Sequence, residues 1–179
     1  MTGPVVLVLA SGRGERFLAS GGRTHKLQAL LGGKPVLEHT LDAVRASGLR
    51  WHLEQAPHPG MGDSIAAAVR ATSEAASWLI LPADLPLVRP DTLRCIAEAP
   101  PAQVVVRPVY QARQGHPVRF HRDCGDALRA LQGASGAASV LRQFPLCTVD
   151  VDDPGCVTDI DTLDDLQRAQ QVLAARRPR

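Results

Sequence analysis

The stretch Pro4-Val5-Val6-Leu7-Val8-Leu9-Ala10 runs directly into Ser11-Gly12-Arg13-Gly14-Glu15-Arg16-Phe17, and the fold depends on this junction. Its first part is an unbroken apolar run rich in β-branched residues, which is typical of a strand buried on both faces. Strands of this kind occur in parallel sheets that helices cover on both sides. We therefore predict an α/β fold with this strand at the centre of a mostly parallel, Rossmann-like sheet.

The loop that follows the strand is suited to binding an anion. Gly12 and Gly14 lack a Cβ atom, so the backbone can turn sharply and direct successive N–H groups toward one ligand. Arg13, Arg16 and Lys26 add positive charge beside the turn, which favours an extended polyphosphate as the ligand. The alternative is an ordinary strand-to-helix turn with solvated arginines.

The loop matches neither of the two common phosphate-binding motifs. Phe17 stands where Gly-x-Gly-x-x-Gly would have its third glycine, and no Gly-Lys-Ser/Thr closes the loop. A dinucleotide site and a kinase-like phosphate loop are therefore disfavoured.

Length and composition indicate one globular domain over residues 1–179, because 45% of the residues are apolar and 21% are charged. The net charge of +2 is too small to indicate a nucleic-acid or membrane partner. The basic end, Arg176-Arg177-Pro178-Arg179, is expected to be a disordered tail from about residue 175.

The four cysteines are widely spaced and form no Cys-x-x-Cys pair, so neither a zinc knuckle nor a redox pair is indicated: Cys95, Cys124, Cys147 and Cys156. Isolated thiols in a chain with no charged-then-apolar leader favour a reducing compartment. We expect a cytoplasmic protein.

Apolar periodicity, glycines and prolines divide the rest of the chain into alternating helices and strands. In the first half, the patterns predict a flexible segment at 18–26, a helix at 34–44, a strand at 50–54, a helix starting at Asp63 or Ser64 and a strand at 78–81. A helix capped by Asp91 and ending at Ala97 follows, and then strands at 103–106 and from His116. The last predicted elements are helices at 123–131 and 138–143, a strand at 145–151 and a helix capped by Thr162.

Three carboxylates are candidates for a magnesium site. Asp84 follows a buried strand, and ligands of open parallel sheets gather at the carboxyl ends of strands. Mg²⁺ prefers one or two carboxylates together with phosphate oxygens, so Asp84 opposite a polyphosphate loop is a natural ligand, although it could instead cap a turn. Asp161, and less firmly Asp159, could supply the second carboxylate.

Other polar residues at the predicted helix starts, in the flexible segment and at the strand start have roles of their own. Asp164 and Asp165 lie in the first turn of the last helix and are expected to interact with its dipole. Asp63 and Ser64 could cap a helix or contact a ligand, and His25 could contact a ligand or be solvated. His116 could be a general base, a ligand contact or a packed core residue.

Five separated motifs, which span residues 5 to about 170, resemble those of the nucleotidyltransferases that complete molybdenum cofactors, the MobA-like family: 9–17 with Lys26, Gly60-Met61-Gly62-Asp63-Ser64, Leu81-Pro82-Ala83-Asp84-Leu85-Pro86, Gly115-His116-Pro117-Val118 and Asp159-Ile160-Asp161-Thr162. Ala-Ser-Gly after the first strand, Gly-Met-Gly-x-Ser and Gly-His-Pro-Val are similar to the CTP-using branch, the molybdenum cofactor cytidylyltransferases.

The resemblance implies a three-layer α/β/α fold of the nucleotide-diphospho-sugar transferase type, Mg²⁺ dependence, and CTP (or GTP) and a molybdopterin cofactor as substrates, with a molybdenum hydroxylase as a possible client. It implies that Arg16, Lys26 and Asp84 are catalytic, with Asp84 and Asp161 on the metal. His116 and Asp159 would contact the second substrate. The nucleotide would lie against Leu9, Ala10, Ser11, Gly12, Arg13, Gly14, Gly60, Gly62 and Ser64.

Two departures from the resembling family concern the loops. Residues 18–25 are extra residues between the arginine and lysine of the first motif, and the segment after Gly48 is short, with one strand where relatives have two strands and a helix. Alternatives are transfer of GMP, transfer to a sugar or alcohol phosphate on the same fold, and a non-catalytic carrier that delivers the cofactor to a dehydrogenase.

Overall fold

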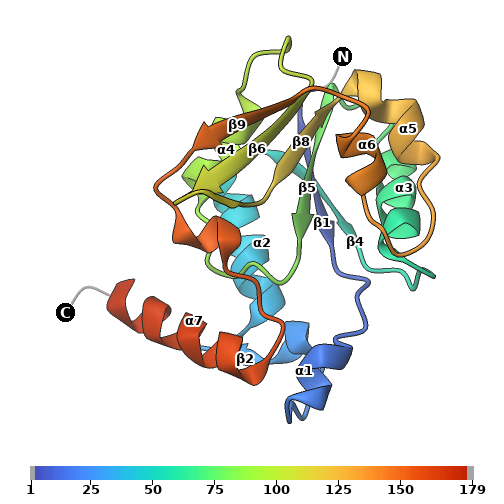
Figure 1. Cartoon of the computed structure of the whole chain (residues 1–179). Helices are drawn as coiled ribbons and strands as arrows, with labels where there is room; N and C mark the ends of the chain where they lie inside the picture. The colour runs from blue at the N-terminus through green and yellow to red at the C-terminus, as the bar shows by residue number, and fades with distance from the viewer. Residues whose placement is uncertain (1–2, 177–179) are drawn as a thin grey trace.

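The computed structural model describes residues 3–176, and a seven-stranded sheet forms its centre (Figure 1). The strand order is β4-β1-β5-β8-β6-β7, with β9 paired to β6. The β1, β4, β5, β6 and β9 strands run in one direction, and β7 and β8 run in the other. The prediction of a mostly parallel sheet is confirmed.

The apolar run at the start of the chain forms β1 (Val5–Leu9), which pairs in parallel with β4 (Arg50–Glu54) and β5 (Ser77–Pro82). All five β1 residues are buried, and alternate side chains enter the cores on opposite faces of the sheet. β1 was predicted to be the central strand, but it is the second strand from one edge of the sheet, with only β4 beyond it.

The second half of the sheet is mixed. Strand β8 (Val118–His121) is antiparallel to both β5 and β6 (Val105–Tyr110), and β9 (Leu146–Asp150) returns in parallel to β6. The short β7 (Arg113–Gln114) pairs with the end of β6 and is separated from β8 by 115–117. A predicted strand start at His116 therefore lies two residues early.

Helices cover both faces and complete the predicted three layers (Figure 1). One core joins the sheet to α2 (Val36–Ser47) and α4 (Pro90–Ala97). The other core joins it to α3 (Met61–Ala71), α5 (Gly125–Arg129) and α6 (Ala138–Leu141). Each face is thus closed by helices that place their apolar side chains on the sheet.

The remaining elements are short, except for the last helix: α1 (Glu15–Ala19), η1 (Lys26–Gln28), β2 (Leu30–Leu31), β3 (Lys34–Pro35), η2 (Arg122–Cys124), η3 (Pro154–Val157) and α7 (Leu163–Arg176). Figure 1 shows α1 and the start of α7 at the end of the molecule toward which β1 and β5 run.

Several predicted helix boundaries need correction. Gly60, rather than Asp63 or Ser64, is the N-cap of α3. Asp91 does not cap α4, whose N-cap is Arg89, because Pro90 takes the first helical position and Asp91 forms an ion pair with Arg94. A tail was expected from about residue 175, but α7 reaches Arg176, so residues 175 and 176 are helical; 177–179 lie outside the described residues.

None of the helices in the described part of the chain has the length and hydropathy that a membrane-spanning helix requires. The four cysteines are free thiols, and two of them, Cys124 and Cys156, are buried.

Candidate active site

A cleft of about 810 Å³ opens where β1 and β5 end. Its walls come from the loops after these strands, the segment between β4 and α3, the β7–β8 region and the segment before α7. Most of the predicted site residues line this cleft: Ser11, Gly12, Arg13, Gly14, Arg16, Lys26, Gly60, Asp84, His116, Asp159 and Asp161. The other four, Leu9, Ala10, Gly62 and Ser64, are not among its lining residues.

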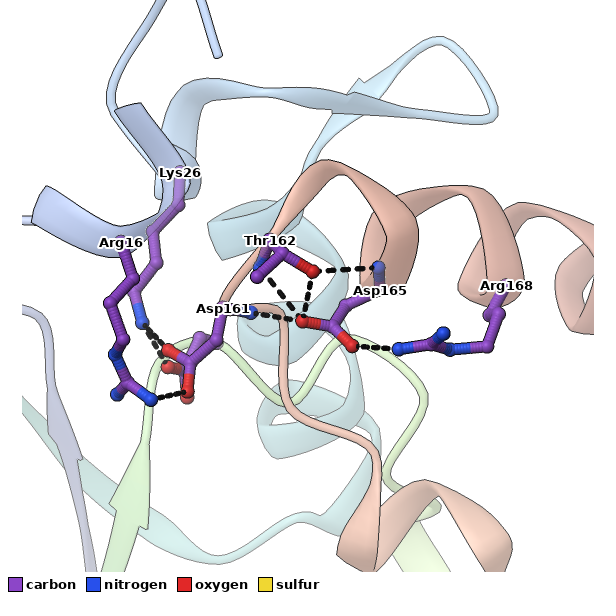
Figure 2. Close-up of polar contacts among 7 residues, drawn as sticks. Arg16, Lys26, Asp161, Thr162, Asp165 and Arg168 are labelled. Carbon is purple, nitrogen blue, oxygen red and sulfur yellow. Dashed lines mark hydrogen bonds and ion pairs between the residues drawn. The ribbon is translucent and has the colours of Figure 1, made fainter. Parts of the chain in front are cut away.

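Two carboxylates meet at one ammonium group in the cleft (Figure 2). The Nζ of Lys26 lies 2.6 Å from Oδ2 of Asp84 and 2.8 Å from Oδ1 of Asp161. The Nη1 of Arg16 lies 2.8 Å from the other oxygen of Asp161. The Lys26 and both aspartate side chains are only 13–16% exposed, whereas that of Arg16 is 77% exposed. The predicted metal ligands are therefore adjacent, and two cations neutralise them.

The carboxylates fit a divalent cation that shares its coordination with a bound phosphate. The Oδ1 of Asp84 is buried and has no hydrogen-bond partner among the described residues, so one ligand oxygen is available. Within residues 3–176 no group of three or more His, Cys, Asp or Glu side chains is arranged to hold a metal. Two carboxylates completed by phosphate oxygens and water are the usual environment of Mg²⁺.

The charges in the cleft depend on one another. Burial lowers the pKa of Lys26, but the adjacent Asp84 and Asp161 outweigh burial, so its pKa lies above the ordinary value and the ammonium stays charged. Desolvation raises the pKa of Asp159, and the negative charges of Asp84 and Asp161 raise it further. Asp159 therefore releases its proton less readily than an exposed aspartate, because it is desolvated and lies near two other carboxylates.

Backbone contacts fix the position of Asp84 at the end of β5. The N–H of Ala83 donates to the carbonyl of Leu9 at 3.0 Å, and the hydroxyl of the buried Thr40 donates to the carbonyl of Ala83 at 2.8 Å. The N–H of Ile160 donates to the carbonyl of Asp84 at 2.9 Å. The role of Thr40 could not be predicted from the sequence, because a single threonine inside a helix pattern carries no signal for a contact 43 residues away.

The glycine loop is held by His25. Its Nε2 lies 2.6 Å from the carbonyl of Gly12, and its Nδ1 accepts from the N–H of Leu27 at 3.2 Å. These contacts require the tautomer with hydrogen on Nε2. Gly14 adopts a left-handed backbone (φ 66°), and a Cβ there would lie 3.3 Å from the His25 ring. His25 therefore shapes the loop, a role that neither predicted alternative, a ligand contact or a solvated side chain, had included.

Hydrogen bonds join the extra residues 18–25 to neighbouring elements, although most of these residues are exposed. The flexibility expected of 18–26 stays a prediction. The hydroxyl of Ser20 accepts from the N–H of Leu163 at 3.0 Å, which ties the end of α1 to the start of α7. The N–H of Gly22 donates to the carbonyl of Phe17 at 3.1 Å. The insertion thus connects the first motif to the last.

The start of α3 is joined to neighbouring loops beneath the cleft. The hydroxyl of Ser11 donates to that of the fully buried Ser64 at 2.9 Å. A Cβ on Gly60 would lie 2.3 Å from the Gly133 carbonyl group, and the N–H of Gly62 donates to that carbonyl at 2.8 Å. The glycines of this motif therefore allow close packing against the segment before α6.

His116 lines the cleft and is partly buried. Its backbone N–H donates to the carbonyl of Cys156 at 2.8 Å, and its Nδ1 is buried without a hydrogen-bond partner in the described structure. Burial lowers the pKa of His116 to about 4, and the positive charge of Arg107 contributes. An imidazole with this pKa is neutral and a weak base at pH 7, which favours a contact role over a general base.

Two basic residues that line the cleft were not among the predicted site residues. His58 lies between β4 and α3, and its Nε2 is 3.1 Å from Oε1 of the buried Glu54. Arg113 in β7 donates through Nη2 to the carbonyl of Val157 at 2.9 Å. His58 could have been found from its position just after a predicted strand. Arg113 could not, because its position in the cleft depends on the hairpin between β6 and β7.

Comparisons with known proteins agree with this architecture. The sequence pattern of the MobA-like NTP transferase domain family matches residues 42–149. The bifunctional protein GlmU of Alkalilimnicola ehrlichii is 32% identical over 117 residues, which are 52% of this chain and 25% of that protein. The chain thus spans about a quarter of the length of this curated relative.

Two solved structures extend the likeness to nearly the whole chain. Rv0371c from Mycobacterium tuberculosis H37Rv superposes with a TM-score of 0.77 at 25% identity, over 96% of this chain and 100% of that one. Molybdopterin-guanine dinucleotide biosynthesis protein A from Archaeoglobus fulgidus superposes with a TM-score of 0.71 at 21% identity, over 96% and 99%. The second likeness concerns the fold alone. The family match covers more than half of the sequence, and the chain belongs to the MobA-like NTP transferase domain family.

Proposed function

We propose that the protein is a Mg²⁺-dependent nucleotidyltransferase that transfers CMP from CTP to the terminal phosphate of a molybdopterin cofactor. The observation that carries this proposal is the meeting of Asp84 and Asp161 at Lys26, in the cleft that the 12–14 loop also lines. Nucleotidyl transfer depends on positioning and on neutralising phosphate charge more than on a covalent intermediate. A site of two carboxylates and two cations suits that requirement.

In the proposed reaction an oxygen of the acceptor phosphate forms a bond to the α-phosphorus of CTP. The bond from that phosphorus to the bridging oxygen breaks, and pyrophosphate leaves with the electron pair. Asp84 and Asp161 would hold Mg²⁺, which withdraws charge from the phosphate oxygens when it is bound. No side chain of the protein becomes covalently attached to the nucleotide.

Arg16 and Lys26 would stabilise the leaving pyrophosphate. Their positive groups lie within 3 Å of the carboxylates, so binding of a metal there would release them toward the phosphates. The side chain of Arg16 is largely exposed and can make this change by rotation. Backbone N–H groups of Gly12, Arg13 and Gly14 would cradle the same phosphates.

The remaining predicted residues divide into contacts and supports. Ser11 and Gly60 line the cleft and would contact the nucleotide, whereas the following four would support the cleft from below: Leu9, Ala10, Gly62 and Ser64. His116 and Asp159 lie with Arg113 along the wall formed by β7, β8 and the segment before α7, where we place the acceptor.

The choice of CTP and of molybdopterin rests on the Ala-Ser-Gly, Gly-Met-Gly-x-Ser and Gly-His-Pro-Val motifs, which resemble the cytidylyltransferase branch. We further propose a single domain over residues 1–179, a cytoplasmic location and a molybdenum hydroxylase as the client enzyme. Transfer of GMP, transfer to a sugar or alcohol phosphate, and a carrier role are the competing functions.

Pyrophosphate release tests the proposal. The purified protein is incubated with Mg²⁺ and each of CTP, GTP, ATP and UTP, with and without a molybdopterin acceptor, and then with a sugar phosphate. Acceptor-dependent release from CTP alone is expected. Release from GTP would overturn the choice of base, and release only with a sugar phosphate would overturn the acceptor. Tight pterin binding with no release from any nucleotide would indicate a carrier.

A further inference from the structure

Asp165, in the first turn of α7, contacts the backbone of the segment that carries Asp161 (Figure 2). Its Oδ2 accepts from the N–H of Asp161 at 3.1 Å and from the N–H and hydroxyl of Thr162, each at 2.7 Å. Its Oδ1 pairs with Nη2 of Arg168 one turn further along the helix. Both oxygens of the Asp165 carboxylate are therefore engaged, and Oδ2 alone accepts three hydrogen bonds.

Ordinary helix capping accounts for only part of this arrangement. Thr162 and Asp165 form a reciprocal capping box, in which the N–H of Asp165 also donates to the threonine hydroxyl at 3.2 Å. A capping box satisfies the backbone of its two members and requires no bond to the residue before them. The bond from the N–H of Asp161 is therefore additional, and it reaches the residue whose carboxylate faces Lys26.

The other side of Asp161 is fixed as well. Ile160 is fully buried, and its N–H donates to the carbonyl of Asp84, the second carboxylate of the cleft. Asp161 is held between this bond and the oxygen of Asp165, in a segment that belongs to no helix or strand. Without the Asp165 contact, its backbone would be held on the Ile160 side alone while Arg16 and Lys26 attract its side chain.

We propose that Asp165 is a positioning residue, which holds the Asp161 carboxylate where it can share a divalent cation with Asp84. This inference rests on the proposed function, because it assumes that the two carboxylates bind a metal. Groups that orient a metal ligand from behind affect metal affinity by roughly 10- to 100-fold when they are removed. The same order is expected here.

The chain contains a matched control in Asp164. This exposed aspartate lies in the same first turn, so its removal costs the same favourable interaction with the helix dipole. A second control, Thr162→Ala, damages the capping box but leaves the Asp161 N–H and the Asp165 carboxylate in place. Together these variants separate positioning of the metal ligand from stability of the helix.

Mn²⁺ is the probe, and its free concentration is measured by electron paramagnetic resonance in the presence of CTP. Asp165→Ala is expected to raise the Mn²⁺ dissociation constant roughly 10- to 100-fold, and Asp164→Ala to change it less than twofold. Thr162→Ala should lower the unfolding midpoint in urea about as much as Asp165→Ala with a much smaller effect on Mn²⁺. Asp165→Glu, which retains a carboxylate at the capping-box position, should restore most of the affinity.

The outcomes distinguish this inference from the proposed function. Weaker Mn²⁺ binding by Asp165→Ala supports the inference even if the wild-type protein releases no pyrophosphate from any nucleotide. Equal Mn²⁺ affinities in the wild type, Asp165→Ala and Asp164→Ala would overturn it, even if the wild type is active. If Asp165→Ala does not fold, Asp165→Asn is compared with Asp164→Asn by the same criterion. A wild-type protein that binds no Mn²⁺ overturns both proposals.

Discussion

The Lys26 ammonium lies between two carboxylates that reach it from distant parts of the chain. Asp84 is 58 residues away and Asp161 is 135 residues away, yet both oxygens are within 2.8 Å of the same nitrogen. A cation at this point is needed to keep two carboxylates so close, because like charges repel strongly when they are partly buried. The lysine and a metal would therefore satisfy the same electrostatic requirement at different stages of the reaction.

Asp84→Asn should lower turnover by about 10²–10³, the usual cost of losing one major electrostatic contact with a reacting group. The amide keeps the shape of the side chain but cannot supply the negative charge that a divalent cation requires. Pyrophosphate release at saturating substrate measures the effect, and circular dichroism checks the fold. Asp63→Asn is the control, since Asp63 accepts from the N–H of Gly133 away from Lys26. Turnover of Asp84→Asn close to that of wild type would contradict the metal assignment.

His116 should make the protein less stable in acid. Because its pKa is lowered to about 4 in the folded state, the unfolded chain binds its proton first as the pH falls below about 6.5. Protons bound to the unfolded state favour unfolding, so the free energy of unfolding decreases between about pH 6.5 and pH 4. The contribution of this one group is at most about 3 kcal/mol.

Urea unfolding of the wild type and of His116→Asn at pH 7.5 and pH 4.5 measures that contribution. The variant should lose less stability between the two values, because asparagine does not titrate. His39→Asn serves as the control, because it removes a histidine whose ring contacts the carbonyl of Leu31, away from the cleft. An equal loss of stability in wild type and His116→Asn would show that another group causes the acid sensitivity.

At the level of elements, hydrogen bonds of the buried Asp153 connect α4 with η3, which lies in the segment before Asp161. Asp153, the N-cap of η3, is 1% exposed and accepts from the N–H of Arg89, the hydroxyl of Thr92 and the N–H of Gly155 at 2.7–2.9 Å. This carboxylate joins the segment after β5 to the segment that leads to Asp161. It was not singled out in the sequence, where two consecutive aspartates after a strand resemble a solvated turn.

Asp153→Ala should lower the free energy of unfolding by about 2–4 kcal/mol, because it leaves several buried donors without an acceptor. Asp152→Ala changes the exposed neighbour and should stay within about 0.5 kcal/mol of wild type. Chemical denaturation of the two variants beside wild type gives both values. Similar stabilities of the two variants would mean that the donors find water or other partners.

Elements with a strong local pattern were predictable from the sequence, and elements fixed by distant contacts were not. The strand at 50–54 matches β4, and Thr162 caps α7 as expected. The antiparallel direction of β8 depends on the hairpin that reverses the chain after β6, which apolar periodicity does not reveal. At the site, residue types indicated a phosphate loop and carboxylates, but the contacts of His25, Thr40 and Asp165 depend on backbone atoms that the sequence does not place.

For the whole molecule, binding of CTP with Mg²⁺ should stabilise the fold. A ligand at a hundred times its dissociation constant adds about 2.7 kcal/mol, which corresponds to a rise of about 5–10 °C in Tm for a chain of this size. Thermal denaturation with CTP and Mg²⁺, with CTP and EDTA, and with Mg²⁺ alone separates the contributions. Asp161→Asn should lose the part that requires the metal. The same shift with EDTA as with Mg²⁺ would contradict a metal shared between protein and nucleotide.

The 135-residue separation between Lys26 and Asp161 also affects when the protein can become active. A ribosome produces the chain from its N-terminus, so the phosphate loop, β4 and β5 emerge well before the segment that carries Asp161. Local contacts can form in that interval, whereas contacts with a long sequence separation must wait for their partner. The carboxylate pair therefore comes together only after residues 1–161 have left the ribosome, and a nascent chain arrested before residue 161 would have no complete site.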